Sequence, residues 1–527
     1  MPTDALRQPL IALLGGEKED VRLLQQMTGA QVVGLSRLYE AKTLVIMWRF
    51  GGSVPDVLRR AQAARWLVIL VDRRRQGQRG WYPGRAMRAL RRAGWRLAGE
   101  YWAKPSAVNV TAWIPLTSVP AVRWYVCTQL IPVSLARRGV STLVARAPTM
   151  ASRLMPWLVS SYGLVAVRDS GLASHDEVSA RPMALAAAKE AGLLPAYREA
   201  AVVTGGEGAW SRVTTIPFGD RSGVPAVVVK SARLSEHNGA TEAEQATLQS
   251  LRAHLPADLV DSLPQPMGMT KLDELSVAVE SFVPGAPLHL RLEQLRGRPE
   301  QQAGLIRLAA EWLTRFHLAT SGEPVPAARA DVRAMLDETL SRYSRIFAHE
   351  SPAERELANQ AGEQLAQLYP ASAPTVIVHR DLGPWNVILT GPRKIAVIDW
   401  EMAAPGPPLL DLLYFLLHCT WVTRRHQNPD EQVGEMLELI GVVMVGDPVM
   451  KAAQEATSSY LAQLGLDARL VPALLVAMLG QQALDRHDRL QAVRDPRAGE
   501  RAHNRYVACL ARLASSDLMT GLTGSGS

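Results

Sequence analysis

One segment, VIVHRDLGPWNVIL at residues 376–389, constrains the fold of this chain more than any other. Two apolar runs, Val376–Val378 and Val387–Leu389, enclose a polar loop. Short apolar runs bounded by turn residues predict buried strands, so both ends of the loop are expected to be fixed. Three polar side chains of the loop are candidates for the chemistry: His379, Asp381 and Asn386.

A second carboxylate follows at a suitable distance along the chain. Lys394–Ile398 predicts another strand, and Asp399 follows it in the order IDWE. One hairpin can therefore bring Asp399 close to Asn386. Phosphoryl transfer to a hydroxyl needs a carboxylate near the attacking oxygen and oxygen ligands for Mg²⁺. Asp381 can supply the first, and Asn386 with Asp399 can supply the second, so the pattern predicts a phosphotransferase centre.

Upstream residues fit the same chemistry. The apolar strand Ala226–Val229 leads directly to Lys230, whose ammonium can reach the α and β phosphates of a nucleotide. The next predicted helix, Ala240–His254, carries two candidate partners for this lysine; Glu244 is the first choice and Glu242 its rival. Small residues between two earlier strands let backbone N–H groups approach phosphates. These glycines are Gly205, Gly206 and Gly208.

Residues about 198–520 resemble the aminoglycoside phosphotransferase and choline kinase family, which has a protein-kinase-like fold. The resemblance rests on HRDLGPWN, IDWE, VVVK with Glu244, ESFVPGAPL (280–288) and LTRFH (313–317). It implies an α+β domain of two lobes that uses ATP and Mg²⁺. The roles that it implies are catalytic base for Asp381, Mg²⁺ ligands for Asn386 and Asp399, phosphate contact for Lys230, orientation of that lysine for Glu244, adenine-binding hinge for Glu280, Ser281 and Phe282, and structural support for His379 and Asp411.

The same segment bears on the acceptor. Arg380 stands where the family often has glycine, and Gly383 stands where protein kinases mostly carry lysine. Asp-Phe-Gly and Ala-Pro-Glu elements are absent from the sequence. These features favour a small-molecule hydroxyl acceptor, such as a sugar, an amino alcohol or an aminoglycoside-like compound. Two alternatives stay open: a non-catalytic nucleotide-binding scaffold and a protein kinase.

The C-terminal acidic residues speak against a polycationic acceptor. Asp485, Asp488 and Asp495 are spread along the chain and partly matched by neighbouring arginines. A polycationic antibiotic would be expected to meet a denser group of carboxylates, so antibiotic resistance is not the first choice.

The N-terminal part predicts a smaller α/β domain of Rossmann-like type. Strands are expected at 31–34, 43–48 and 66–72, helices at 54–65 and 85–93, and a closing strand pair at 95–102 and 108–115. This order faintly resembles the second half of a class I methyltransferase. Gly15–Gly16 has no predicted strand before it, so the domain is expected to be degenerate.

Charge is concentrated at the same end of the chain. Residues 1–150 hold 23 Lys and Arg against 8 Asp and Glu, whereas the whole chain carries only +8. Nine arginines lie between residues 73 and 96. Such density predicts either an anionic partner or a solvated arginine-rich helix face.

The expected organisation has five parts. These are an α/β module at 1–120, a mixed helical connector at 121–197, a kinase-like N-lobe at 198–288, a helical C-lobe at 289–520 and a flexible tail at 521–527. No leader or membrane-spanning run is evident in the sequence, so a cytoplasmic location is expected.

Overall fold

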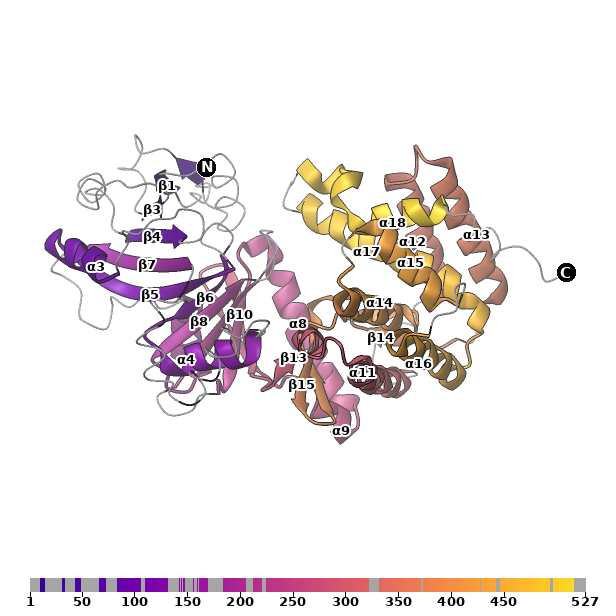
Figure 1. Ribbon diagram of the computed structural model, residues 1–527, viewed down its shortest axis with the longest axis horizontal. Coiled ribbons are helices and arrows are strands. Elements are labelled where there is room, and N and C mark those ends of the chain that lie inside the picture. The colour runs from indigo at the N-terminus through magenta and orange to yellow at the C-terminus, as the bar shows by residue number, and fades with distance from the viewer. Residues whose placement is uncertain are drawn as a thin grey trace, which may run out of the picture. The chain divides into compact units, whose positions relative to one another are not determined.

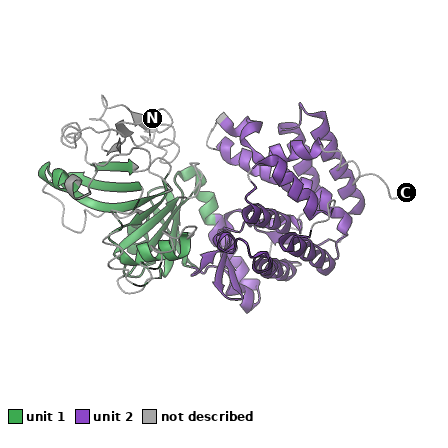
Figure 2. Ribbon diagram, in the orientation of Figure 1, with its two compact units in different colours: residues 1–242, 266–282 green, residues 243–265, 283–527 purple. Residues whose placement is uncertain are grey.

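The computed structural model of this chain forms two compact units (Figure 2). The first comprises residues 1–242 with 266–282, and the second comprises residues 243–265 with 283–527. The residues that the structure describes are 10–14, 31–33, 43–48, 66–72, 83–105, 110–130, 142, 144, 146, 155, 159, 161–168, 183–204, 212–219, 224–321, 331–370, 373–426, 428–441, 446–492 and 496–515.

Twelve strands of the first unit form one continuous sheet (Figure 1). Their order is β11-β12-β10-β9-β8-β6-β5-β7-β4-β3-β1-β2. The bounds are β1 Leu10–Leu14, β2 Gln31–Val33, β3 Thr43–Trp48, β4 Trp66–Asp72, β5 Trp95–Pro105, β6 Val110–Pro115, β7 Ser161–Arg168, β8 Glu199–Thr204, β9 Val213–Phe218, β10 Val227–Ser231, β11 Pro266–Leu272 and β12 Leu275–Ser281.

The N-terminal end of this sheet is parallel, as the α/β prediction requires. β1 pairs in parallel with β2 and β3, and β3 pairs in parallel with β4. The expectation that no strand precedes Gly15–Gly16 is wrong, because β1 ends at Leu14. Five apolar residues are a weak local signal, and pairing on both sides makes them a strand. The predicted helix at 54–65 lies outside the described residues.

The expected mixed helical connector at 121–197 contains helical segments, and it also supplies a central strand of the sheet. β7 pairs antiparallel with both β4 and β5, so it lies inside the sheet. The same stretch supplies helix α7, Met183–Glu190. Ala184, Leu185 and Ala188 of this helix pack in one buried cluster with valines of β10 and β12. The prediction of a separate connector is therefore wrong, because β7 and α7 both belong to the sheet unit.

The predicted closing hairpin exists, and it joins the two sequence regions. β5 pairs antiparallel with β6, and β6 pairs antiparallel with β8 at Trp113↔Val202. Helix α4, Val119–Trp124, packs here: the Trp124 ring lies 5.8 Å from that of Phe218 in β9. One buried apolar cluster contains residues from β4 through β9. N-terminal strands and kinase-like strands thus share a core.

Arginines are exposed on helix α3, Pro83–Arg92, in the first unit. Arg88, Arg91 and Arg92 all face solvent there, and Gly94 follows the helix with φ of 75°. A left-handed residue of this kind commonly ends a helix. Arg73, Arg74, Arg75 and Arg79 lie outside the described residues.

Helices dominate the second unit (Figure 1). Their bounds are α8 Asn238–His254, which begins in the first unit, α9 Ala257–Val260, α10 Leu288–Gln294, α11 Pro299–Thr320, α12 Val332–Ile346, α13 Pro352–Leu368, α14 Leu410–Arg424, α15 Pro429–Leu439, α16 Pro448–Leu464, α17 Val471–Ala492 and α18 Arg505–Ala514. The short strands are β13 Ala286–Pro287, β14 Val376–Val378, β15 Val387–Gly391, β16 Lys394–Val397 and β17 Ala404–Gly406.

Several of these helices begin on one local signal. Ser351, Asn428 and Asp447 each accept a hydrogen bond from a backbone N–H in the first turn, and each precedes a proline. A polar cap satisfies an orphan donor, and proline at the first position loses no helical hydrogen bond.

Apolar side chains of α14 and α17 are buried together in one large core. No single described helix is long and apolar enough to cross a membrane. One bent pair, Pro448–Leu464 with Ala468–Ala492, passes that test by length and composition, with a 119° break.

Candidate functional site

Two strand pairs fix the predicted catalytic loop. β14 pairs with β17 on one side of the loop, and β15 pairs with β16 on the other. Val387 lies opposite Val397, as the predicted hairpin requires. The backbone N–H of Ile398 donates to the carbonyl of Asn386 at 3.0 Å. The loop and the strand end that carries Asp399 are therefore held together by backbone hydrogen bonds.

Asp381 is oriented by hydrogen bonds on both carboxylate oxygens. Tyr414 Oη donates to its Oδ1 at 2.9 Å, and Asn386 Nδ2 lies 3.4 Å from its Oδ2. Burial raises the pKa of Asp381, Arg489 opposes that rise and the charge of Asp399 adds to it. The charge of Asp399 therefore affects the pKa of Asp381, as expected for two carboxylates that lie near each other. The motif gave no signal for Tyr414, which lies 33 residues further along the chain.

Asn386 and Asp399 present oxygen atoms at this loop. The Asn386 amide nitrogen donates to the Asp381 carbonyl at 2.8 Å, which fixes the amide orientation. Asp399 follows β16 and adopts a left-handed backbone with φ of 72° and ψ of 56°. Left-handed geometry at a residue other than glycine is strained and is frequent at functional positions.

Asp411 braces the loop through its backbone. Its Oδ2 accepts from the His379 N–H at 2.5 Å, and its Oδ1 accepts from the Arg380 N–H at 2.9 Å. His317 Nε2 lies 3.6 Å from the same carboxylate. Burial alone would raise the pKa of Asp411, but His317, His379 and these hydrogen bonds outweigh it and lower the pKa. Arg380 has φ of 67°, so the brace holds a strained residue in place.

The His379 ring supports the loop from inside. Its Nδ1 accepts from the Asp381 N–H at 3.3 Å, so its Nε2 carries the proton and donates to the Ile398 carbonyl at 3.0 Å. The ring also packs on Trp400, with centroids 4.7 Å apart. These contacts agree with a structural role and link the loop to the Asp399 strand.

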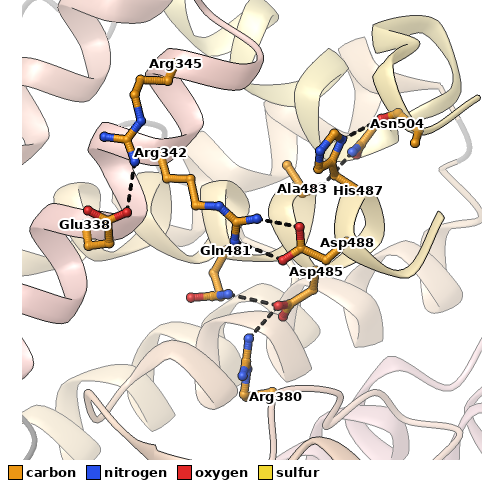
Figure 3. A network of polar contacts seen from close by, with 11 residues as sticks. Glu338, Arg342, Arg345, Arg380, Gln481, Ala483, Asp485, His487, Asp488 and Asn504 are labelled. Carbon is orange, nitrogen blue, oxygen red and sulfur yellow. Dashed lines mark hydrogen bonds and ion pairs between the residues drawn. The ribbon is translucent and has the colours of Figure 1, made fainter. Parts of the chain in front are cut away.

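Arg380 also joins the loop to α17 (Figure 3). Its guanidinium donates to Asp485 Oδ1 at 2.5 Å, and Gln481 Nε2 donates to the same oxygen at 3.0 Å. One helical turn away, Arg342 binds both oxygens of Asp488. In the sequence, arginines of the same helix lie next to these two aspartates. In the structure, Asp485 instead forms its ion pair with the loop and Asp488 with α12.

The presence of glycine at position 383 has a local steric explanation. A Cβ atom at this position would collide with the indole ring of Trp385. The Asp381 carbonyl accepts the Gly383 N–H at 2.8 Å, and the Gly383 carbonyl accepts the Asn386 N–H at 2.9 Å. Glycine therefore allows the tight turn and makes room for the tryptophan.

The predicted nucleotide residues of the first unit lie on neighbouring strands. Lys230 Nζ is 2.8 Å from Glu280 Oε1, and both side chains are buried. Glu242 Oε1 accepts from Ser276 Oγ at 2.6 Å. Glu280 as a side-chain partner of the lysine was not foreseen, because only its backbone was assigned a role.

The remaining predicted residues have the following places. Ser281 ends β12, and the Phe282 N–H donates to the Ala226 carbonyl at 2.9 Å. In the second unit, Glu244 is fully buried and accepts the Trp400 N–H at 2.9 Å. The pairing of Glu244 with Lys230 stays a prediction. Gly205, Gly206 and Gly208 lie outside the described residues.

A strand-rich region followed by helices, with a braced His-Arg-Asp loop and an aspartate after the next strand, is the arrangement of a kinase-like fold. Residues 214–448, a little less than half of the chain, match the family model described as "Phosphotransferase enzyme family".

Two curated proteins are similar to parts of the chain. Viomycin phosphotransferase from Streptomyces vinaceus is 30% identical over 171 residues, which cover 31% of this chain and 58% of that protein. The trifolitoxin immunity protein from Rhizobium leguminosarum bv. trifolii is 30% identical over 128 residues, which cover 20% of this chain and 47% of that protein. The chain thus spans about half the length of the curated relatives it matches.

Solved structures of aminoglycoside phosphotransferases are also similar. A thermostable mutant of APH(4)-Ia in its apo form has 16% identity and a TM-score of 0.39, covering 62% of this chain and 98% of that one. The GDP complex of an aminoglycoside 2'-phosphotransferase-IIIa mutant has 14% identity and a TM-score of 0.40, covering 65% and 98%.

Proposed function

We propose that this chain transfers the γ-phosphoryl group of ATP to a hydroxyl of a small molecule, such as a sugar, an amino alcohol or an aminoglycoside-like compound. The observation that carries the proposal is the Asp381 carboxylate, half-buried and held by Tyr414 and Asn386. A raised pKa makes a carboxylate a better proton acceptor. The family match of residues 214–448 supports the same reaction class.

In this reaction the acceptor hydroxyl oxygen bonds to the γ-phosphorus while the bond to the β-phosphate oxygen breaks. The hydroxyl proton passes to the Asp381 carboxylate. Positioning supplies most of the catalysis in such transfers, because the transition state is loose and needs little covalent help. The double hydrogen bond on Asp381 and the brace at Asp411 provide that positioning.

Asn386 and Asp399 fit a Mg²⁺ site. The Asn386 amide nitrogen is used on the Asp381 carbonyl, which turns its oxygen toward other partners. With the Asp399 carboxylate this gives two hard oxygen donors, and Mg²⁺ typically takes one or two such groups together with substrate phosphates and waters. A Mg²⁺ ion bound by these two residues would neutralise negative charge on the phosphates of the nucleotide.

The nucleotide contacts in this proposal come from the first unit. Lys230 contacts the α and β phosphates, and the backbone of residues 280–282 binds the adenine. Glu244 orients the lysine, and Gly205, Gly206 and Gly208 offer backbone N–H groups to the phosphates. The buried ion pair between Lys230 and Glu280 holds the ammonium on β10 beside β12.

Substitution of the base tests the proposal. Asp381→Asn should lower turnover by roughly 10²–10⁴-fold, because general-base assistance is lost. Binding of Mg·ATP, followed by thermal shift, should persist. Asp488→Asn is the matched control, since this carboxylate forms a half-exposed ion pair on α17. ATP consumption would be followed over a panel of sugars, amino alcohols and aminoglycosides. Equal turnover of Asp381→Asn and wild type would overturn the assignment.

The metal ligands have a separate test. Asp399→Ala should abolish the Mg²⁺-dependent part of the thermal stabilisation by ATP, because one of two protein oxygens is removed. An undiminished Mg²⁺-dependent shift in this variant would contradict the ligand assignment.

A further inference from the structure

A cavity of about 540 Å³ lies in the second unit beside the catalytic loop. This volume lies within the usual range of small-molecule sites. Its lining comes from the loop, from α10, α14, α15 and α18, and from residues that follow α14. The lining residues are Glu293, Trp385, His418, Trp421, Val422, Arg425, His426, Gln432 and Arg505.

Flat rings form one part of the wall. The Trp385 and His418 rings meet edge to face at 4.8 Å, and those of His418 and Trp421 meet in the same way at 4.6 Å. Burial lowers the pKa of His418 far below its usual range, so this imidazole is neutral at physiological pH. Aromatic rings in the wall of a cavity favour a flat, unsaturated ligand.

Two arginines supply the charge. The guanidinium of Arg505 lies 5.7 Å from the Trp421 ring centroid and donates to Tyr506 Oη at 2.8 Å. Arg425 follows α14 with φ of 62°. Both side chains are exposed, and neither forms an ion pair with a carboxylate in the described part of the chain. Glu293 is the one carboxylate among the described residues that line the cavity.

Two acidic residues of α17 already form ion pairs with arginines. Asp485 is paired with Arg380, and Asp488 with Arg342, as Figure 3 shows. A cationic ligand would have to displace an arginine to use either carboxylate. Arg425 and Arg505 could bind an anionic ligand without first breaking an ion pair. The charge arrangement therefore favours anions over cations at this cavity.

Side chains connect the cavity to the proposed base. Arg505 hydrogen-bonds Tyr506, whose Oη lies 3.5 Å from Tyr414 Oη, and Tyr414 donates to Asp381. Trp385 belongs to the catalytic loop itself and contacts Tyr414 with ring centroids 6.3 Å apart. A ligand in the cavity thus touches Trp385 and His418, whose rings pack against Tyr414.

We propose that this cavity binds the phosphate acceptor through an anionic group on a flat framework, so that the acceptor class is a hydroxylated aromatic or unsaturated acid. The assignment of the ligand as acceptor rests on the proposed function; the preference for a flat anion does not. The rings take the framework and the two arginines take the acid group.

Three probes of one shape test this inference on the full chain. They are para-(hydroxymethyl)benzoate, para-(hydroxymethyl)benzamide and para-(hydroxymethyl)benzylamine, which differ in charge at one end. Binding is measured by ligand-detected NMR titration without nucleotide. The benzoate should bind roughly tenfold more tightly than the benzylamine, with the benzamide between them. Arg425→Gln and Arg505→Gln should each reduce this preference several-fold. Arg345→Gln, an exposed arginine paired with Glu338, should leave it unchanged.

Equal binding of the three probes, tighter binding of the benzylamine, binding of none, or a preference insensitive to both cavity arginines would overturn the inference. Phosphorylation of the benzoate by Mg·ATP, lost in Asp381→Asn, would establish the acceptor role. If the charge preference fails while ATP turnover on another acceptor depends on Asp381, the acceptor class is wrong and the proposed function stands. If the preference holds while turnover never depends on Asp381, the proposed function and the acceptor role fall together.

Discussion

Replacing Asp411 with alanine should destabilise the second unit and disorganise the catalytic loop. The carboxylate accepts two backbone N–H groups, from His379 and Arg380, and is almost fully buried. Each donor left without an acceptor costs roughly 1–3 kcal/mol. The left-handed backbone of Arg380 adds strain that the brace no longer opposes. The loss in free energy of unfolding is therefore expected to be about 2–5 kcal/mol.

Urea unfolding measures this loss, with turnover recorded on the same samples. Glu338→Ala is the control, because Glu338 belongs to an exposed ion pair worth less than about 1 kcal/mol. Since the folded pKa of Asp411 is lowered, its contribution is present above the unfolded pKa and is lost as pH falls through the folded value. The difference between wild type and Asp411→Ala should therefore shrink in acid. Matching midpoints for Asp411→Ala and Glu338→Ala at neutral pH would refute the reasoning.

Two further changes probe the loop. Gly383→Ala should cost about 1–3 kcal/mol and lower turnover, because the new Cβ displaces the Trp385 ring; an unchanged urea midpoint would contradict this. Tyr414→Phe removes a hydrogen bond that lowers the pKa of Asp381 against the larger effect of burial. The acidic limb of the kcat/KM profile should therefore move to higher pH, since the base must be ionised, and a limb that stays in place would argue against Tyr414 as a positioning residue.

Sequence patterns predicted elements whose signals are local. The hairpin after Asn386 formed as expected, because apolar runs flank a turn of suitable length. The strand at 66–72 was predicted within the observed bounds for the same reason. β7 was not predicted, since its neighbours β4 and β5 lie far away in sequence and pairing with both makes the strand.

The candidate site likewise has features that local sequence patterns predicted and features that they did not. The spacing of Asp381, Asn386 and Asp399 predicted oxygen groups at one loop. The structure links these segments by hydrogen bonds from the Asn386 side chain to the Asp381 carbonyl and from the Ile398 N–H to the Asn386 carbonyl. Tyr414 and Asp485 were not predicted as loop partners, because α14 and α17 approach the loop only through tertiary packing. Contacts of that kind leave no trace in the spacing of a motif.

The pairing of β6 with β8 has a practical consequence for anyone who dissects this chain. A fragment that starts near residue 198 would retain the kinase-like strands but lose β6, which leaves the β8 backbone as a bare sheet edge. Unpaired edges recruit other strands, so such a fragment is prone to self-association. It would also lose Trp124 from beside Phe218, and α7 from beside β10 and β12. The smallest piece worth expressing therefore begins upstream of the phosphotransferase family segment, within the N-terminal sheet.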